Sequence, residues 1–423
     1  MMRIAVADYS GHPFQVQLSR ELAARGHTAL HLHFSEFLTP KGKLDEDADD
    51  PKTFSSEPVS LGRPFAKYRF FLRRKQEIEV GRRFVSRIEQ FAPDLVVASN
   101  MPLDALRQIV HYRRKLGYGL VFWQQDIYSI AITRILMQKF GVLGSPVGAY
   151  YKAIEKQALQ QSDAVVAISS DFLEPLKQQF GLPGEKVHVI ENWAPLHEIT
   201  CRAKINEWST AQGLVDKEVI LYTGTLGMKH NPALILSVAE AVRTRPNAVV
   251  VVISEGEVAE ALGRQAAAAG LNNLRVLPFQ SYDVYPDVLG SADVLISILE
   301  PDAGIYSVPS KVLSYLCAGR AIVLSAPSEN LACTILQKSK AGICTSAGCG
   351  SSFGAAVVRL LEDSELRQEA ASNGRKYAEI HFDIEQITSK FERVFRSALP
   401  SKARAQGREA ISDASVTDPL GQS

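Results

Sequence analysis

The chain has 423 residues, of which 46% are apolar and 22% are charged, so it can form two or three compact domains and is not disordered throughout. Its 47 basic and 46 acidic residues give a net charge of +1, which excludes a protein that binds nucleic acid through an overall positive field. It has no uninterrupted apolar run of about 18 residues, so no membrane span is expected.

Short β-branched runs alternate with helical patterns such as 14–25 and 102–116. This alternation is typical of parallel sheets covered by helices on both faces. The sequence therefore predicts two doubly wound α/β domains. The expected strands are 4–8, 29–34, 94–99, 120–124, 163–168 and 187–190 in the first half, and 219–223, 248–254, 274–277, 293–299 and 321–325 in the second.

The boundary between the domains is expected within 192–216, where a strand ends at Pro195 and a polar stretch follows. We expect an N-terminal domain at 1–195 and a C-terminal domain at 196–375, facing each other across a deep cleft. A helical pattern at 376–399 can cross back to the first domain. Residues 400–423 lack periodic hydrophobicity and are predicted to be a disordered tail.

Residues 40–90 interrupt the alternation with an acidic run and then a basic, aromatic stretch. Between 63 and 87 there are nine Lys or Arg and two Glu, a local charge of +7, with Arg73, Arg74 and Lys75 adjacent. Such a segment can lie on an anionic membrane or bind a phosphate-bearing acceptor. The alternative is an amphipathic helix with buried aromatic residues and solvated arginines.

The cysteines are odd in number, and none lies at metal-ligand spacing from other cysteines or histidines. We therefore expect reduced thiols, a cytoplasmic location and no metal site. The N-terminal residues pass straight into a strand, without the pattern of a secretory signal. The five cysteines are Cys201, Cys317, Cys333, Cys344 and Cys349.

Ligands of doubly wound sheets bind at the carboxyl ends of the strands. After the first strand, Gly11 permits a tight turn and His12 is a candidate donor or base, unless the two are an ordinary turn and a surface histidine. Asp126 follows the strand 120–124 and can accept a proton from a hydroxyl group, with a helix N-cap as the alternative. Trp193 offers a face for a sugar or belongs to the core.

In the second domain, two loops suit phosphate. Gly224 and Gly227 expose backbone N–H groups beside Lys229, a combination that favours a diphosphate over a plain turn. Ser310 and Lys311 begin a helix whose N–H groups can hold phosphate oxygens. Gly256 lies at the same edge of the sheet.

In this order, the motifs resemble those of the GT-B glycosyltransferases, specifically the retaining family 4 branch that makes bacterial envelope polysaccharides. The resemblance covers about residues 2–395. It rests on LAARGH at 22–27, APD at 92–94, WQQD at 123–126, IENW at 190–193, YTGTLGMKH at 222–230, VPSK at 308–311 and AGRAIV at 318–323.

The resemblance implies that the second domain binds a nucleoside diphosphate sugar. Its diphosphate would lie at Gly224, Thr225, Gly227 and Lys229, with Gly256, Ser310 and Lys311 close by. The acceptor would bind in the first domain at Gly11, His12 and Asp126. His12, Asp126 and Lys229 are the expected catalytic residues. Lys229 and fixed N–H groups would stabilise the departing diphosphate.

The sequence departs from the family pattern at the two glutamates that members usually carry eight positions apart. Tyr306 and Ser314 occupy these positions, and Thr225 stands where many members have arginine. The donor sugar therefore stays open. Lys229 is expected to be the main cation at the diphosphate.

The expected function is transfer of a sugar, of the hexosyltransferase type, from a nucleoside diphosphate sugar to a lipid-linked or polysaccharide acceptor. The resemblance implies a retaining reaction, and no metal or other cofactor is expected. Contact with an anionic membrane through Arg73, Arg74 and Lys75 is a further expectation. The alternatives are a nucleotide-sugar epimerase of the same architecture and a catalytically silent binding protein.

Overall fold

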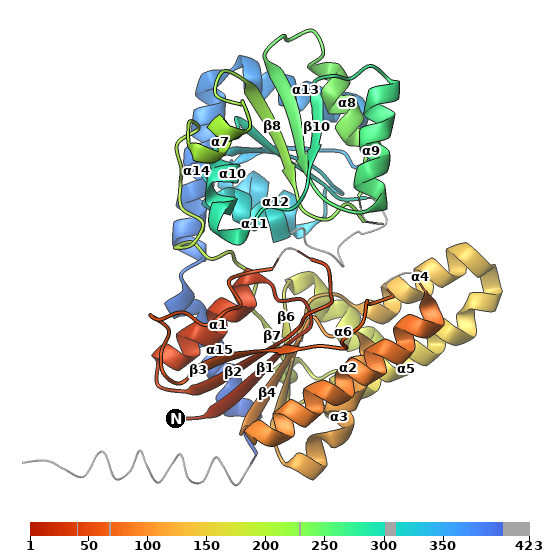
Figure 1. The fold of residues 1–423 in the computed structure, drawn as a ribbon. Coiled ribbons are helices and arrows are strands. Elements are labelled where there is room, and N and C mark those ends of the chain that lie inside the picture. Colours follow the sequence, from red (N-terminus) through yellow and green to blue (C-terminus); the bar gives the residue numbers. More distant parts are fainter. Residues whose placement is uncertain (40, 67–68, 228–229, 301–309, 401–423) are drawn as a thin grey trace, which may run out of the picture.

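The computed structural model describes residues 1–39, 41–66, 69–227, 230–300 and 310–400. These ranges form two α/β domains, one above the other in Figure 1, and each is built on a parallel sheet with helices on both faces. The prediction of two doubly wound domains is confirmed. The predicted tail lies outside the described residues, apart from Pro400.

The first domain contains a seven-stranded parallel sheet with strand order β3-β2-β1-β4-β5-β6-β7. Its central strands are fully buried apolar runs, as expected for strands covered on both faces. The order reverses between β1 and β4, and doubly wound sheets bind ligands at such a point. The strands are β1 (Arg3–Asp8), β2 (Thr28–Phe34), β3 (Phe54–Val59), β4 (Leu95–Ser99), β5 (Gly119–Gln124), β6 (Ala164–Ala167) and β7 (Val187–Val189).

Helices connect these strands. A left-handed glycine ends α3, where Gly117 has φ 78° and its N–H donates to the Arg113 carbonyl. The α-helices are α1 (Pro13–Ala24), α2 (Phe70–Phe91), α3 (Leu103–Leu116), α4 (Tyr128–Phe140), α5 (Ser145–Gln161) and α6 (Leu173–Phe180). The 3-10 helices are η1 (Gly141–Gly144), η2 (Ser170–Phe172) and η3 (Gly184–Lys186).

The second domain contains a six-stranded parallel sheet with strand order β10-β9-β8-β11-β12-β13. The strands are β8 (Glu218–Thr223), β9 (Ala248–Ile253), β10 (Leu274–Leu277), β11 (Val294–Ile298), β12 (Ala321–Ser325) and β13 (Gly342–Thr345). The helices are α7 (Glu207–Ala211), α8 (Ala233–Ala241), α9 (Glu257–Ala268), η4 (Tyr282–Val284), α10 (Tyr285–Gly290), α11 (Ser310–Cys317), α12 (Leu331–Ser339), α13 (Gly350–Glu362) and α14 (Ser364–His381).

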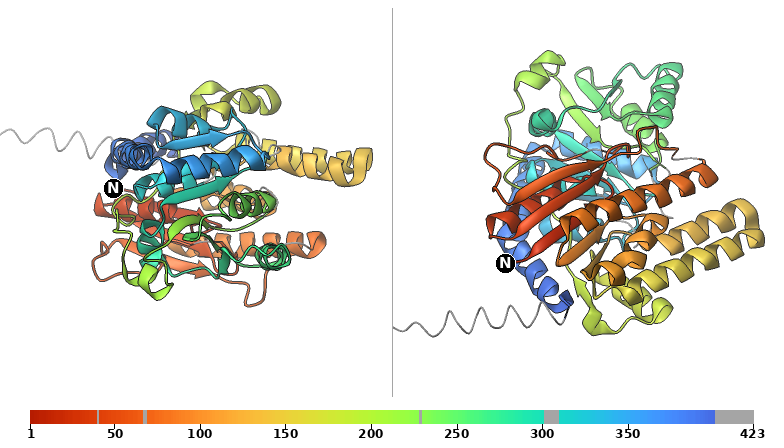
Figure 2. Two further views of the ribbon diagram at one scale, coloured as in Figure 1. Left: turned by 90° about the horizontal axis from the view of Figure 1, so that it is seen from above. Right: turned by 60° about the horizontal axis from the view of Figure 1, so that its bottom comes forward.

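The last helix, α15 (Ile384–Ala398), packs on the first domain, against α1, β5 and β6. The Asp383 carboxylate caps its first turn by accepting the Glu385 and Gln386 N–H groups. Phe391 is fully buried, and its ring centroid lies 4.8 Å from that of Trp123. Arg25 and His27 of the first domain reach Glu392 at 3.4 and 3.0 Å. The end of the chain therefore ties the two domains together (Figures 1 and 2).

The expectation that the segment 40–90 interrupts the alternation is wrong. It contains β3, which pairs in parallel with β2, and then the long helix α2. β3 and β13, each at a sheet edge, were both missed. Their residues are mostly half-buried, so the sequences FSSEPV and GICT lack the apolar run of a central strand.

The expectation of five reduced cysteines is wrong for one pair. A disulfide joins Cys333 on α12 to Cys344 on β13, whose Cα atoms lie 5.8 Å apart. The two residues come together because α12 packs on β13, a contact that their spacing in the sequence does not reveal. Cys201, Cys317 and Cys349 are free.

Candidate active site

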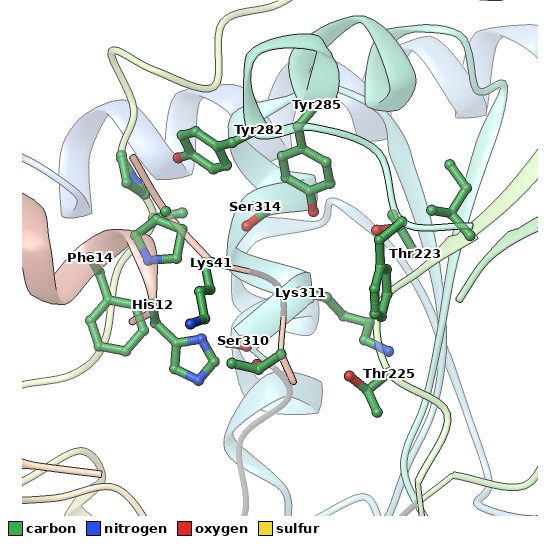
Figure 3. Close-up of a pocket in the computed structure, with 18 of the residues that line it drawn as sticks. His12, Phe14, Lys41, Thr223, Thr225, Tyr282, Tyr285, Ser310, Lys311 and Ser314 are labelled. Atoms are coloured by element: carbon green, nitrogen blue, oxygen red, sulfur yellow. The ribbon is translucent and has the colours of Figure 1, made fainter. Parts of the chain in front are cut away.

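A cavity of about 560 Å³ lies between the two domains, and residues of both line it. In the first domain the lining segments follow β1, β2 and β7. In the second they follow β8, β10 and β11. Both sheets thus direct their carboxyl ends at one cleft, as predicted. Figure 3 shows eighteen of the lining residues.

Among the described lining residues, Lys311 on α11 is the one Lys or Arg that the second domain contributes. Its Nζ donates to the Tyr222 hydroxyl at 2.5 Å and lies 3.8 Å from the centroid of the Tyr222 ring. Burial lowers the pKa of Lys311 to about 7. A buried amine with aromatic and hydroxyl neighbours gains charge stabilisation from an anion that enters the cavity.

The loop after β8 passes directly over Lys311. Gly224 has φ 121°, and a Cβ there would lie 3.3 Å from Lys311 Cε, so glycine provides both the turn and the space for the lysine. The N–H groups of Gly224 and Gly227 donate to the Ile253 carbonyl and to His230 Nδ1. These two N–H groups, predicted to face the diphosphate, are therefore used within the domain.

Hydroxyl groups gather on the same wall above Lys311 (Figure 3). Tyr285, with a pKa that burial raises to about 12, faces Thr223 and Ser314. Ser314 occupies one of the two positions at which the family usually has glutamate. This part of the cavity is therefore lined by neutral hydroxyl groups in place of a carboxylate.

The first-domain wall is held by a buried carboxylate behind it. Asp8 ends β1 and accepts the N–H groups of Ser10 and Gly11, both at 2.8 Å. These bonds fix the turn that places His12 before α1, where the His12 ring stacks near Phe14 at 5.8 Å. Lys41 follows β2, lines the cavity and donates to the Phe34 and Ser35 carbonyls.

Aromatic rings support this wall from behind. Trp193 lines the cavity yet is only 1% exposed, and it stacks on Trp123 with centroids 5.7 Å apart and an interplanar angle of 11°. Its indole N–H donates to Gln17 Oε1 at 2.6 Å. Phe14 and Phe391 contact both tryptophans edge-on. Trp193 is thus mainly a core residue.

The charge of the described lining is one-sided. It contains two lysines, Lys41 and Lys311, and two histidines, His12 and His230, but no Asp or Glu. Nor does any group of three or more His, Cys, Asp or Glu among the described residues form a metal-binding cluster. Such a lining suits an anionic ligand.

The structure brings together some of the predicted site residues: His12, Gly224, Thr225, Ser310 and Lys311 all line the cavity. Gly11, Asp126, Gly227 and Gly256 do not, although each lies at the carboxyl end of a strand. Lys229 and Tyr306 lie outside the described residues.

Other lining residues were not predicted, notably Lys41, Tyr282 and Tyr285. A signal for the tyrosines was present, since they follow the expected strand 274–277 at the edge where ligands bind. Lys41 was not predicted because the segment that contains it was interpreted as an insertion.

The predicted basic patch carries less free charge than its sequence suggests. Arg73 pairs with Glu77 at 2.7 Å, and Arg74 lies 3.3 Å from Asp104 and 2.7 Å from the Tyr150 hydroxyl. Lys75 is exposed. Within the described residues, no helix is both long and apolar enough to cross a bilayer.

Fold and cleft together define a two-domain α/β protein that suits an anionic ligand between its domains. Residues 14–198 match the family described as Glycosyltransferase Family 4, and residues 204–377 match glycosyl transferases group 1. The chain belongs to the family 4 glycosyltransferases, and its two domains form a GT-B fold.

Two curated relatives match parts of the chain. One, from Escherichia coli K12, is assigned to colanic acid biosynthesis as the glycosyl transferase WcaI and is 26% identical over 186 residues. The other is the alpha-D-kanosaminyltransferase of Streptomyces kanamyceticus, 23% identical over 251 residues. The matches cover 43% and 58% of this chain, and they span 45% and 63% of the relatives.

Solved structures share the fold over most of the chain. HepE of Anabaena, in complex with UDP and glucose, is 18% identical with a TM-score of 0.69, covering 94% of this chain and 100% of HepE. WaaG, a glycosyltransferase involved in lipopolysaccharide biosynthesis, is 16% identical with a TM-score of 0.65, covering 91% of this chain and 98% of WaaG.

Proposed function

We propose that the protein transfers a sugar from a nucleoside diphosphate sugar to a lipid-linked or polysaccharide acceptor in cell-envelope or exopolysaccharide biosynthesis. The observation that carries the proposal is the one-sided charge of the cavity, which has lysines on both walls and no carboxylate in its described lining. A diphosphate is the part of such a donor that this lining recognises.

The proposed donor site is the second-domain wall, at Gly224, Thr225, Ser310 and Lys311. The departing diphosphate gains negative charge as the glycosidic bond breaks, and Lys311 would neutralise it. HepE, which was solved with UDP and glucose, supports this choice of donor through its shared fold. Gly227, Gly256 and Lys229 remain predicted contributors.

We further propose a retaining reaction that needs no metal or other cofactor. Family membership supports the retaining outcome, and the absence of carboxylates from the described lining supports metal independence, because carboxylate oxygens are the usual ligands of Mg²⁺. The lysines and helix N-termini would then supply the positive charge.

The acceptor is proposed to enter along the first-domain wall, past His12 and Lys41, with Gly11 as a predicted contributor behind them. His12 would hydrogen-bond the acceptor or take its proton, and Asp126 remains a predicted base. The relatives support a glycan or lipid acceptor, since WcaI is assigned to colanic acid biosynthesis. A location at the cytoplasmic face of the plasma membrane would suit such an acceptor.

The test is incubation of the purified protein with a panel of nucleoside diphosphate sugars, with and without a bacterial lipid extract. Release of nucleoside diphosphate that depends on the extract is expected. Isomerisation of the donor without extract would instead establish an epimerase, and binding without turnover would establish a silent binding protein. The variant Lys311→Met serves as the inactive control.

A further inference from the structure

Exposed apolar side chains concentrate on one part of the first domain. Of the sixteen large apolar side chains that are exposed among the described residues, ten lie on the first turn of α2 or on the hairpin formed by α4, η1 and α5. These ten, here termed the apolar patch, are Phe70, Phe71, Leu72, Ile135, Met137, Phe140, Val142, Leu143, Val147 and Tyr150.

The most exposed residues of the hairpin lie at its turn. Val142 and Leu143 are 81% and 86% exposed, and the neighbouring Phe140 is 59% exposed. Along α4, whose sequence is largely apolar, Ser129 is the one fully buried residue. Tyr128, Ile130 and Ile132 in its N-terminal part pack against the core, but the rest of this apolar helix leaves its large apolar side chains mostly in solvent.

The hairpin is nevertheless a well-built element. Gly144 and Gly148 let its two helices approach closely, because a Cβ at these positions would lie 2.6 Å from the Leu136 carbonyl oxygen and 2.7 Å from Thr133 Oγ1. At its base, the buried Glu155 accepts the N–H groups of Tyr128 and Ser129. The exposed turn therefore belongs to an ordered projection (Figures 1 and 2).

The first turn of α2 lies beside α5 of the hairpin. The Phe70 ring lies 6.5 Å from that of Tyr151 on α5, and Arg74 donates to the Tyr150 hydroxyl. Because α4 starts just after the carboxyl end of β5, the base of the hairpin lies at the edge of the sheet that faces the cavity.

The charge of the hairpin indicates the partner. Between 128 and 161 there are four cations, Arg134, Lys139, Lys152 and Lys156, and all four are exposed. The sole acidic residue in this range is Glu155, which is buried. The exposed surface of the hairpin is thus apolar and cationic, a combination that matches the interface of an anionic bilayer.

We propose that the apolar patch inserts into the interfacial region of an anionic membrane, with Phe140, Val142 and Leu143 entering first and the hairpin lysines contacting lipid phosphates. The membrane would then lie beside the open edge of the cleft. This extends the proposed function by placing a lipid-linked acceptor next to the first-domain wall, but its evidence and its test do not depend on catalysis.

The test is flotation with vesicles of phosphatidylcholine, with and without phosphatidylglycerol. Wild type is expected to bind the anionic vesicles, and V142S/L143S to bind them at least about tenfold more weakly, because two apolar side chains would no longer be transferred from water into the interface. The matched control is I205S/I380S, which replaces two side chains that are 63% and 68% exposed outside the patch. This control should bind like wild type.

A second pair separates charge from apolar insertion. K139Q/K152Q is expected to lose roughly fivefold in binding per lysine and to show a weaker salt dependence than wild type, since Arg134 and Lys156 remain. R243Q/R264Q, at exposed positions in the second domain, is the control. Circular dichroism melting and nucleoside diphosphate binding by calorimetry should be the same in all variants.

Three results would overturn the inference: no binding of wild type to anionic vesicles, equal binding of V142S/L143S, or a wild-type dimer in sedimentation velocity that V142S/L143S abolishes. The last would assign the patch to a second copy of the chain. Vesicle binding without nucleotide binding would refute the proposed function and leave this inference standing.

Discussion

The two walls of the cavity differ in how they use a buried charged group. On the first-domain wall, the Asp8 carboxylate lies behind the surface, and its two oxygens accept the Ser10 and Gly11 N–H groups. On the second-domain wall, the Lys311 amine lies at the surface of the cavity, against the ring and hydroxyl of Tyr222. The first charge shapes a loop, whereas the second is available to a ligand.

This difference suggests a division of labour. A buried carboxylate that accepts several N–H bonds is already stabilised and gains little from a ligand. A buried amine beside a hydroxyl group and an aromatic face is poorly compensated, so an anion restores the charge stabilisation that burial removed. The first wall is therefore expected to respond to mutation mainly in stability and acceptor use, and the second mainly in donor binding.

The largest effect is expected behind the first wall, from Phe391→Ala. Phe391 is fully buried edge-on against Trp123 and Trp193, and its loss should lower the free energy of unfolding by about 3–5 kcal/mol. Urea unfolding measures this. Phe71→Ala, at a side chain that is 81% exposed, is the control and should change it by less than about 0.5 kcal/mol. Equal effects would show that α15 does not support the wall.

On the second wall, Lys311→Met should weaken binding of a nucleoside diphosphate by about a hundredfold, the loss of one buried charge-assisted contact. The same variant should melt at a higher temperature, because it removes a buried amine that lacks a carboxylate partner. Calorimetry and thermal melting measure the two quantities. Lys338→Met, at an exposed lysine of α12, is the control.

Weaker binding together with lower stability in Lys311→Met would contradict this division, since it would mean that the lysine mainly holds the fold. Unchanged binding would remove Lys311 from the donor site. Either result would shift the assignment to Lys229, the cation predicted from the sequence.

Asp8→Asn tests the first wall itself. The asparagine keeps one acceptor oxygen but places an NH₂ group against a backbone N–H, so a loss of about 1–3 kcal/mol in unfolding free energy is expected. Transfer to the acceptor should fall while nucleoside diphosphate binding stays unchanged. Asp216→Asn, at an exposed aspartate in a loop, is the control. Loss of nucleotide binding in Asp8→Asn would show that the two walls are not independent.

The sequence predicted the fold well because central parallel strands are apolar runs with turn signals after them. β8 and β9, with EVILYT and AVVVVI, are clear examples. It failed at β3 and β13, where half-buried edge residues remove that signal. The hairpin of α4 and α5 was also missed, since periodicity cannot show how much of an apolar helix faces a core.

The site was predicted in part, for a related reason. The positions of the loops were enough to predict Lys311 and Ser310. They could not show that the N–H groups of Gly224 and Gly227 are already hydrogen-bonded within the domain. The sequence also could not show that Arg73 and Arg74 face Glu77 and Asp104, which lowers the free charge of the predicted patch. Such pairings depend on tertiary contacts between elements distant in the chain.

The smallest expected effect is a pH dependence that the second wall alone should show. Burial lowers the pKa of Lys311 to about 7, and a bound diphosphate should raise it again. Donor binding should therefore take up about half a proton at pH 7 and nearly one at pH 8, and affinity should fall by up to about tenfold per pH unit above 7.

Folding should respond to pH in the opposite direction. The pKa of Lys311 lies below its unfolded value, so the unfolded chain binds more protons between about pH 7 and 10 and the lysine's contribution to stability rises with pH over that window. Calorimetry of donor binding in buffers of different ionisation enthalpy measures the proton uptake on binding. Lys311→Met should abolish it, because phosphate ionises near pH 6 and contributes little above pH 7. Uptake that persists in this variant would show that another group of the site binds the proton.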